Sequence, residues 1–245
     1  VHVDRACRIR YELEKAVHIA YQGRPGPVLV DLPDNIQRED IDPDKLDSFV
    51  APEKEKTTFG IKKPLDVINQ CQILLKKAER PVLILGWGVR LSGAAELAAQ
   101  LVDRLNIPVL LTWGMRDFLP GDHPLIAGSF GTHGTQSGNF TVQNSDFILS
   151  IGSRLDTHAT GAPLTSFARD AELVMVDIDP AELAKFDKFG RPLNMGVEAD
   201  AGDFITAFLN SSYEQSSTDI KPGLDTVRDW RQQFPDCPLE VYKEK

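Results

Sequence analysis

Apolar residues recur at helical spacing across residues 4–21, which predicts a helix in this part of the chain. A Gly and a Pro-Gly pair then mark a turn. The run PVLVDLP at residues 27–33 has the continuous apolar character of a strand buried on both faces. One helix and one strand cannot close a core, so residues 1–36 are interpreted as the C-terminal end of a preceding domain. The helical positions are Ile9, Leu13, Ala16, Val17 and Ala20.

From residue 61 onward, helical and strand patterns alternate. This alternation predicts an α/β fold, an open parallel sheet with helices on both faces. Ser92 is the expected N-cap of one helix, and Asp179, Pro180 and Glu182 are expected to start another as N-cap, first helical residue and capping-box partner. The expected helices are 64–78, 92–105, one starting at 180, and 200–209; the expected strands are 81–85, 108–112, 146–151 and 172–178.

Two segments lack this periodicity and are rich in charged residues, Ser and Pro. They are residues 37–60 and 211–245, and we interpret both as linkers. The central α/β domain would then occupy residues 61–210. A short amphipathic helix is expected within the second linker, at residues 225–234.

Composition narrows the class of protein. The 245 residues are 42% apolar and 26% charged, with a net charge of -9, so nucleic acid is not expected as a partner. No apolar run approaches the ~20 residues that cross a bilayer, and the charged start is unlike a signal peptide. Three widely spaced cysteines form neither a disulfide framework nor a zinc motif. We therefore expect a cytoplasmic chain without membrane or nucleic-acid partners. The cysteines are Cys7, Cys71 and Cys237.

Gly86 and Gly88 follow the first expected strand of the central domain. Glycines at the carboxyl end of a parallel strand let the backbone approach a phosphate, and the next helix offers free N–H groups. The dinucleotide fingerprint requires a third glycine, which here is Gly93 and comes two positions too late. A tight turn without a ligand explains the two glycines equally well.

A second glycine-rich stretch spans residues 128–139. Its four glycines stand among Ser, Thr, His and Gln, a composition suited to backbone hydrogen bonds to a polar ligand. The alternative is a flexible surface loop in which His133 is a capping or solvent-exposed side chain. No carboxylate or cysteine accompanies His133 at metal-site spacing, so no metal site is predicted.

Charged residues follow two further expected strands. Arg154 comes after residues 146–151 and suits a phosphate, although an Arg154–Asp156 salt bridge is the alternative. Asp177 and Asp179 end the strand at residues 172–178, where carboxylates can bind ribose hydroxyls. Asp179 is also the expected helix cap.

Together these four strand ends favour a nucleotide crevice. They do not supply a catalytic set. The reactive groups nearby are His133, Asp156 and His158, and nothing in the sequence orients them relative to one another. No catalytic residue is predicted.

Several stretches resemble one family. GRPGPVLVDLP is similar to the end of the N-terminal, pyrimidine-binding domain of thiamine diphosphate-dependent enzymes of the acetolactate synthase type. ERPVLILGWGVR, PVLLTWGMRDFLPGDHPLIAGSFGTHGT, NSDFILSIGSRLDTHATG and VMVDIDPAEL resemble successive pieces of its central domain. The resemblance covers nearly the whole chain, in the right order.

The resemblance implies a Rossmann-like central domain with a parallel sheet of about six strands. In the acetolactate synthase branch this domain binds FAD, which takes no net redox part in the main reaction. The implied cofactor contacts, with the adenosine end at Asp177 to Asp179, are Gly86, Gly88, Val89, Arg90, Thr112, Gly131, Thr132, His133, Gly134, Gly152, Ser153, Arg154, Asp156, Asp177, Ile178, Asp179, Asp200 and Ala201.

Two departures from the family pattern bear on the ligand. Thr132 replaces the Met of a Gly-Met-His-Gly loop, and His158 stands where the family has the second Arg of Arg-Phe-Asp-Asp-Arg. These changes leave open whether FAD, ADP or nothing occupies the crevice, and which acceptor the parent protein uses. A structural central domain from a related 2-keto acid decarboxylase or sugar-modifying relative is the main alternative. A freestanding NAD- or ADP-binding module is weaker, since the strand at 27–33 would then have no sheet to join.

The family's thiamine diphosphate site needs a glutamate of the N-terminal domain and a Gly-Asp-Gly…Asn motif of the C-terminal domain. Neither is present in this sequence. The resemblance therefore implies that the parent protein, rather than this chain, binds thiamine diphosphate and Mg²⁺. The parent is expected to act on a 2-keto acid as a homo-dimer or tetramer, and the isolated chain is expected to be inactive.

Overall fold

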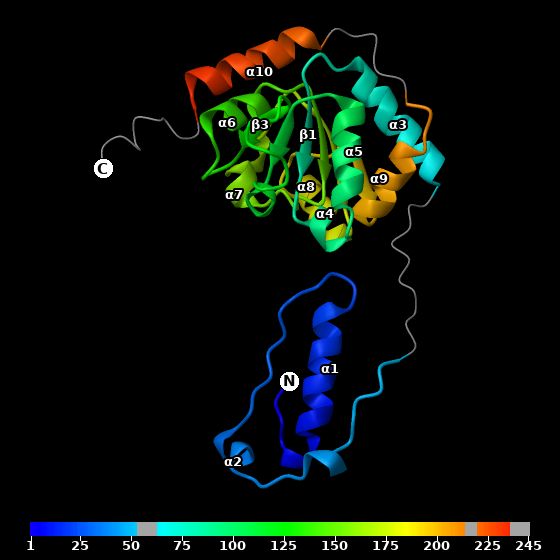
Figure 1. Ribbon diagram of the computed structural model, residues 1–245, viewed down its shortest axis with the longest axis vertical. Coiled ribbons are helices and arrows are strands. Elements are labelled where there is room, and N and C mark those ends of the chain that lie inside the picture. Colours follow the sequence, from blue (N-terminus) through cyan, green and yellow to red (C-terminus); the bar gives the residue numbers. More distant parts are fainter. Residues whose placement is uncertain (53–62, 214–219, 236–245) are drawn as a thin grey trace, which may run out of the picture. The chain divides into compact units, whose positions relative to one another are not determined.

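The computed structural model describes residues 1–52, 63–213 and 220–235 (Figure 1). The chain divides into two compact units, Val1–Thr58 and Phe59–Lys245. Each of the two expected linkers lies partly outside the described residues. Cys237 lies outside them altogether. Within the described ranges, no helix has the length and apolar character needed to cross a membrane.

The first unit contains the expected N-terminal helix. Ion pairs four residues apart, Arg8–Glu12 at 3.0 Å and Arg10–Glu14 at 2.9 Å, stabilise this helix. The unit's elements are η1 (Ala6–Arg8), α1 (Ile9–Tyr21), α2 (Asp34–Gln37) and η2 (Pro43–Lys45).

The strand expected at residues 27–33 does not form. Only an isolated parallel bridge joins Asp31 to His2, with Val3 N donating to Asp31 O at 3.0 Å. Leu29 is 78% exposed. A strand needs a partner along its length to pair its backbone groups, and among the described residues of this unit only the first few lie beside the segment. Both the strand assignment and the expected burial on two faces were therefore wrong.

The second unit is built on a six-stranded, all-parallel sheet, which confirms the expected fold class. The strands lie in the order β3-β2-β1-β4-β5-β6. From β1 the sheet is extended on one side by β2 and then β3. The chain then crosses back, and β4 pairs with the other side of β1. Strand bounds are β1 (Pro81–Leu85), β2 (Val109–Leu111), β3 (Ile126–Ser129), β4 (Phe147–Ile151), β5 (Glu172–Asp177) and β6 (Met195–Glu198).

Helices cover both faces of this sheet (Figure 1). Side chains alternate between two cores: Leu83 and Leu85 of β1 face one, while Val82 and Ile84 face the other. Around the first core lie α3 (Pro64–Lys77), α4 (Gly88–Leu91), α5 (Ala95–Leu105) and α9 (Ala201–Leu209). Around the second lie α6 (Gln136–Gln143), α7 (Thr157–Thr160), α8 (Pro180–Lys188) and α10 (Lys221–Gln233).

Two expected helix starts differ in detail. Ser92 does not cap α5, because the short α4 intervenes; the Ser92 hydroxyl donates to Val89 O at 2.9 Å, and Ala94 precedes α5. Asp179 caps α8 as expected, accepting from Ala181 N at 2.9 Å. The predicted capping box paired the amide of Asp179 with the Glu182 side chain. This amide instead donates to the side chain of Asp177.

The glycine-rich stretch is more regular than its composition suggested. Its second half forms α6, which begins after Thr135, whose hydroxyl accepts from Gly138 N at 3.0 Å. Position 138 requires glycine, because a Cβ there would lie only 2.0 Å from Ser129 O and overlap it. Gly138 thus serves close packing of α6 on β3.

Candidate functional site

The turns after β1 and β4 pack directly against each other. A Cβ at Gly86 would lie 2.1 Å from the Cα of Ser153, and one at Gly88 would lie 2.8 Å from the Cα of Gly152. The amides of Gly86 and Gly88 donate to Ile151 O at 3.0 Å and Gly152 O at 2.9 Å. Backbone therefore meets backbone at the point where the strand order reverses, which by itself accounts for both glycines.

Two exposed tryptophans lie beside this contact, at the ends of β1 and β2. Trp87 is 49% exposed and Trp113 is 65% exposed. A Cβ at Gly114 would lie 3.0 Å from Trp87 Cε3, and the Trp113 ring stacks on His133 with centroids 4.9 Å apart. The turns after β1, β2 and β3 thus form one surface. The tryptophans were not among the site residues expected from the sequence, although a large aromatic residue in the turn directly after an apolar strand was a usable signal.

Arg90 borders the same surface. Its guanidinium carbon lies 5.5 Å from the centre of the Trp87 ring, and Nη2 donates to Asp117 Oδ1 at 2.7 Å. The hydrogen bond from Arg90 lowers the pKa of Asp117. The neighbouring Val89 is fully buried in the first core, so its side chain does not face the surface.

The loop after β3 is held in a defined shape. Gly131 has a φ of 95°, and its amide and carbonyl pair with the Asn139 side chain at 2.8 and 3.2 Å. Thr132 N donates to His158 O at 2.8 Å, which joins this loop to α7. Thr132 and His133 remain exposed. The loop therefore presents two polar side chains on a fixed backbone.

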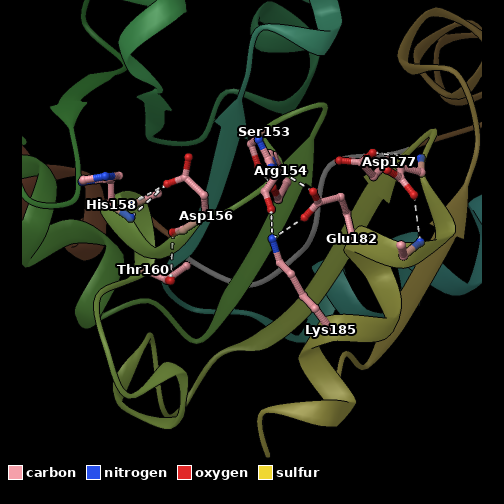
Figure 2. A network of polar contacts seen from close by, with 12 residues as sticks. Ser153, Arg154, Asp156, His158, Thr160, Asp177, Glu182 and Lys185 are labelled. Carbon is pink, nitrogen blue, oxygen red and sulfur yellow. Dashed lines mark hydrogen bonds and ion pairs between the residues drawn. The ribbon is translucent and has the colours of Figure 1, made fainter. Parts of the chain in front are cut away.

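Arg154 follows β4 and is anchored to α8 (Figure 2). Its Nε donates to Glu182 Oε1 at 2.7 Å. The alternative Arg154–Asp156 salt bridge is wrong: Asp156 instead caps α7, accepting from the amide of His158 at 3.0 Å. The Arg154 side chain is 57% exposed, so it still meets solvent.

Glu182 lies between two cations. Lys185 Nζ contacts Glu182 Oε2 at 2.6 Å, and the Glu182 side chain is only 12% exposed. Burial acts to raise the pKa of Glu182, but hydrogen bonds and charges from Lys185 and Arg154 outweigh it, so the pKa is lowered. Glu182 is therefore ionised at neutral pH.

The carboxylates expected at the adenosine end have structural partners. Asp177 is 6% exposed and accepts from the amide of Asp179, which in turn caps α8. Asp200 caps α9 through Gly202 N at 2.8 Å, and Ala201 is buried. Their hydrogen-bonding capacity is thus partly committed to the fold. Ile178 is half-buried at the end of β5, and Thr112 is half-buried at the end of β2, on the other side of β1.

The structure therefore brings most of the predicted residues to one edge of the sheet, in the turns after β1, β2, β3, β4 and β5. What this edge offers is a flat aromatic surface, an exposed arginine and ordered backbone. Such features suit a flat, anionic ligand. Among the residues that the structure describes, no three His, Cys, Asp or Glu side chains gather as a metal site would require.

Comparisons with known proteins point to the same kind of domain. Residues 68–208 match the model of the thiamine pyrophosphate enzyme central domain. The chain is 39% identical over 208 residues to a probable acetolactate synthase large subunit of Methanocaldococcus jannaschii, covering 83% of this chain and 34% of that protein. It is 33% identical over 230 residues to the acetolactate synthase large subunit of Corynebacterium glutamicum, covering 91% of this chain and 35% of that protein. The chain thus spans about a third of the length of the curated relatives it matches.

Proposed function

The chain belongs to the thiamine pyrophosphate enzymes of the acetolactate synthase type, and on that premise we propose that it supplies the FAD-binding central domain of such an enzyme. One observation carries the proposal: Trp87, Trp113 and Arg154 are exposed at the same edge of the sheet. An aromatic surface beside a cation matches a dinucleotide, which has flat rings and a diphosphate.

The residues at this edge fit FAD in chemical type. Arg154 would hold the diphosphate, because a guanidinium binds phosphate oxygens through two parallel N–H groups. Trp113, stacked on His133 at 4.9 Å, would offer a ring face to the flavin or adenine. In this branch of the family the flavin takes no net redox part, so its contribution is to order the turns that it touches.

The parent protein, we propose, decarboxylates pyruvate and transfers the two-carbon unit to a second carbonyl compound. Relatives named acetolactate synthase large subunit support this. Thiamine diphosphate and Mg²⁺ would be held by other parts of a cytoplasmic homo-dimer or tetramer. The described residues of this chain contribute a scaffold and no catalytic group, so the isolated chain is expected to be inactive toward pyruvate.

A second candidate is a central domain that needs no nucleotide. Its support is the packing of Gly86 and Gly88 on Gly152 and Ser153, which explains these glycines without a ligand. The caps made by Asp177 and Asp200 favour it in the same way.

Titration of the purified chain with FAD, followed by quenching of flavin fluorescence, separates the two candidates. The FAD-binding domain predicts saturable quenching that ADP reverses, together with quenching of tryptophan fluorescence. Arg154→Met should weaken binding, whereas Arg169→Met, at an exposed arginine outside this edge, should not. Absence of saturable binding would overturn the FAD proposal in favour of the structural domain.

A further inference from the structure

We propose that Glu182 and Lys185 of α8 are positioning residues, which hold Arg154 ready for the diphosphate of the ligand. The inference rests on the proposed function. It concerns two side chains that belong to neither the expected cofactor contacts nor the turns at the strand ends.

Both the side chain and the backbone of Arg154 are fixed by this pair (Figure 2). Glu182 Oε1 accepts from Arg154 Nε at 2.7 Å, and its other oxygen accepts from Lys185 Nζ at 2.6 Å. Lys185 Nζ also donates to the carbonyl oxygen of Arg154 at 2.5 Å. The three groups form a closed ring of hydrogen bonds.

The backbone at Arg154 needs such support. Arg154 and Leu155 both have left-handed conformations, with φ of 61° and 47°. Consecutive non-glycine residues rarely adopt this conformation, because Cβ approaches the following carbonyl oxygen. The bond from Lys185 stabilises the carbonyl orientation of this turn, while Leu155 is buried beneath it. The turn therefore holds Arg154 against α8, where its side chain pairs with Glu182.

The geometry leaves part of the guanidinium for a ligand. Glu182 binds Nε, so the terminal Nη groups remain on a side chain that is 57% exposed. Glu182 and Lys185 are themselves only 12% and 21% exposed. A partly buried carboxylate thus orients an arginine that reaches solvent, and the ordering of a long side chain is completed before the ligand arrives.

A positioning role and a simple charge effect predict opposite changes in dinucleotide affinity for one substitution. Glu182→Gln removes a negative charge next to the site, which by charge alone would strengthen binding of an anionic dinucleotide. If Glu182 positions Arg154, the same change weakens binding. The sign of the effect therefore distinguishes the two roles.

The experiment measures FAD affinity of the full 245-residue chain and its variants by flavin fluorescence. We expect Glu182→Gln and Lys185→Met each to weaken binding by about 2- to 10-fold, the range that ordering one long side chain on binding would cost. Asp187→Asn and Lys188→Met are matched controls: they make the same charge changes at exposed positions of the same helix. These controls should change affinity by less than twofold.

A double-mutant cycle excludes a general structural effect. In an Arg154→Met background, Glu182→Gln should no longer weaken the residual affinity, since no guanidinium remains to be positioned and only the charge effect is left. Thermal unfolding of each variant shows whether the fold persists at the temperature of the titration. Glu182→Asp, which keeps the charge, should bind more tightly than Glu182→Gln.

Three results would overturn the inference: tighter FAD binding by Glu182→Gln, an effect no larger than that of Asp187→Asn, or an equal effect with and without Arg154. In each of these cases the wild-type chain still binds FAD, and the proposed function stands. If the wild-type chain itself does not bind FAD, the proposed function fails, and the inference fails with it.

Discussion

Replacing Gly86 with alanine tests whether the contact between the β1 and β4 turns is as tight as the structure indicates. The new Cβ would lie 2.1 Å from Ser153 Cα, 2.3 Å from Gly152 O and 2.6 Å from Ser153 N. All three atoms belong to the backbone, so no rotamer change can relieve the overlap. Either β4 or the turn after β1 has to shift.

The expected destabilisation follows from this geometry. Adding a methylene to a well-packed core typically costs about 1–3 kcal/mol. Because the obstacle at Gly86 is the backbone of the turn that follows the central strand β4, we expect the upper end, about 3 kcal/mol. In a protein of this size each kcal/mol lowers Tm by about 2–4 °C, so the variant should melt about 6–12 °C below wild type.

Two further glycines provide controls for the same substitution. Gly93 has a φ of 71° and nothing within 4 Å of a Cβ, so Gly93→Ala should cost only the left-handed conformation, about 1–2 kcal/mol. Gly121 also has nothing within 4 Å and no positive φ, so Gly121→Ala should be neutral or stabilise by about 0.4–1 kcal/mol.

Urea unfolding monitored by circular dichroism and by tryptophan fluorescence would measure all three variants. Trp87 adjoins Gly86 and should report the transition of this turn. The order of stability should be Gly121→Ala, then Gly93→Ala, then Gly86→Ala. A Gly86→Ala variant within 1 kcal/mol of Gly121→Ala would refute the reasoning, because it would mean that the two turns can separate at little cost.

Three shorter predictions concern hydrogen bonds and titrating groups. Asp146 accepts from Glu79 N at 2.8 Å and Arg80 N at 2.9 Å, so Asp146→Ala should lose about 1.5–3 kcal/mol in urea unfolding and Asp146→Asn less. Burial raises the pKa of Cys71 to about 12. In a variant whose other cysteines are replaced by serine, iodoacetamide at pH 8 should therefore modify Cys71 only as the chain unfolds. Mass spectrometry would follow this modification. The pKa of Glu182 in the folded chain is lowered from 4.5. The ionised carboxylate therefore stabilises the fold above about pH 4.5, and this contribution is lost as the pH falls through the lower pKa of the folded state. In urea unfolding, the stability difference between wild type and Glu182→Gln should vanish below that pKa.

The sequence predicted β1, β4 and β5 well because each contains a run of at least three apolar residues that is buried on both faces. β3 and β6 were not located. β3 contains Gly128, and β6 is an edge strand of four residues in which only Val197 is buried. Short strands at the edge of a sheet carry too little apolar pattern to be recognised without their neighbours.

The site was predictable in position but not in detail. Parallel strands bring their carboxyl ends to one edge, so the turns after β1, β4 and β5 had to lie together. Which atoms pair there depends on packing between distant elements. Arg154 was expected to pair with Asp156, two residues away, but pairs with Glu182 on α8. Several carboxylates likewise cap the helix that follows them, a role recognised from sequence only for Asp179.

The return of the chain from β3 to β4 has a consequence for biosynthesis. β1 pairs with β4 in the middle of the sheet, yet β4 follows β1 about 60 residues later. A ribosome that adds about 5–20 residues per second needs roughly 3–12 s to make that stretch. Until β4 is made, β1 can pair with β2 on one side at most, and the unpaired row of backbone groups on its other side is the kind of strand edge that recruits other chains. A pause in translation before β4 should therefore lower the soluble yield of the protein more than an equal pause after β4.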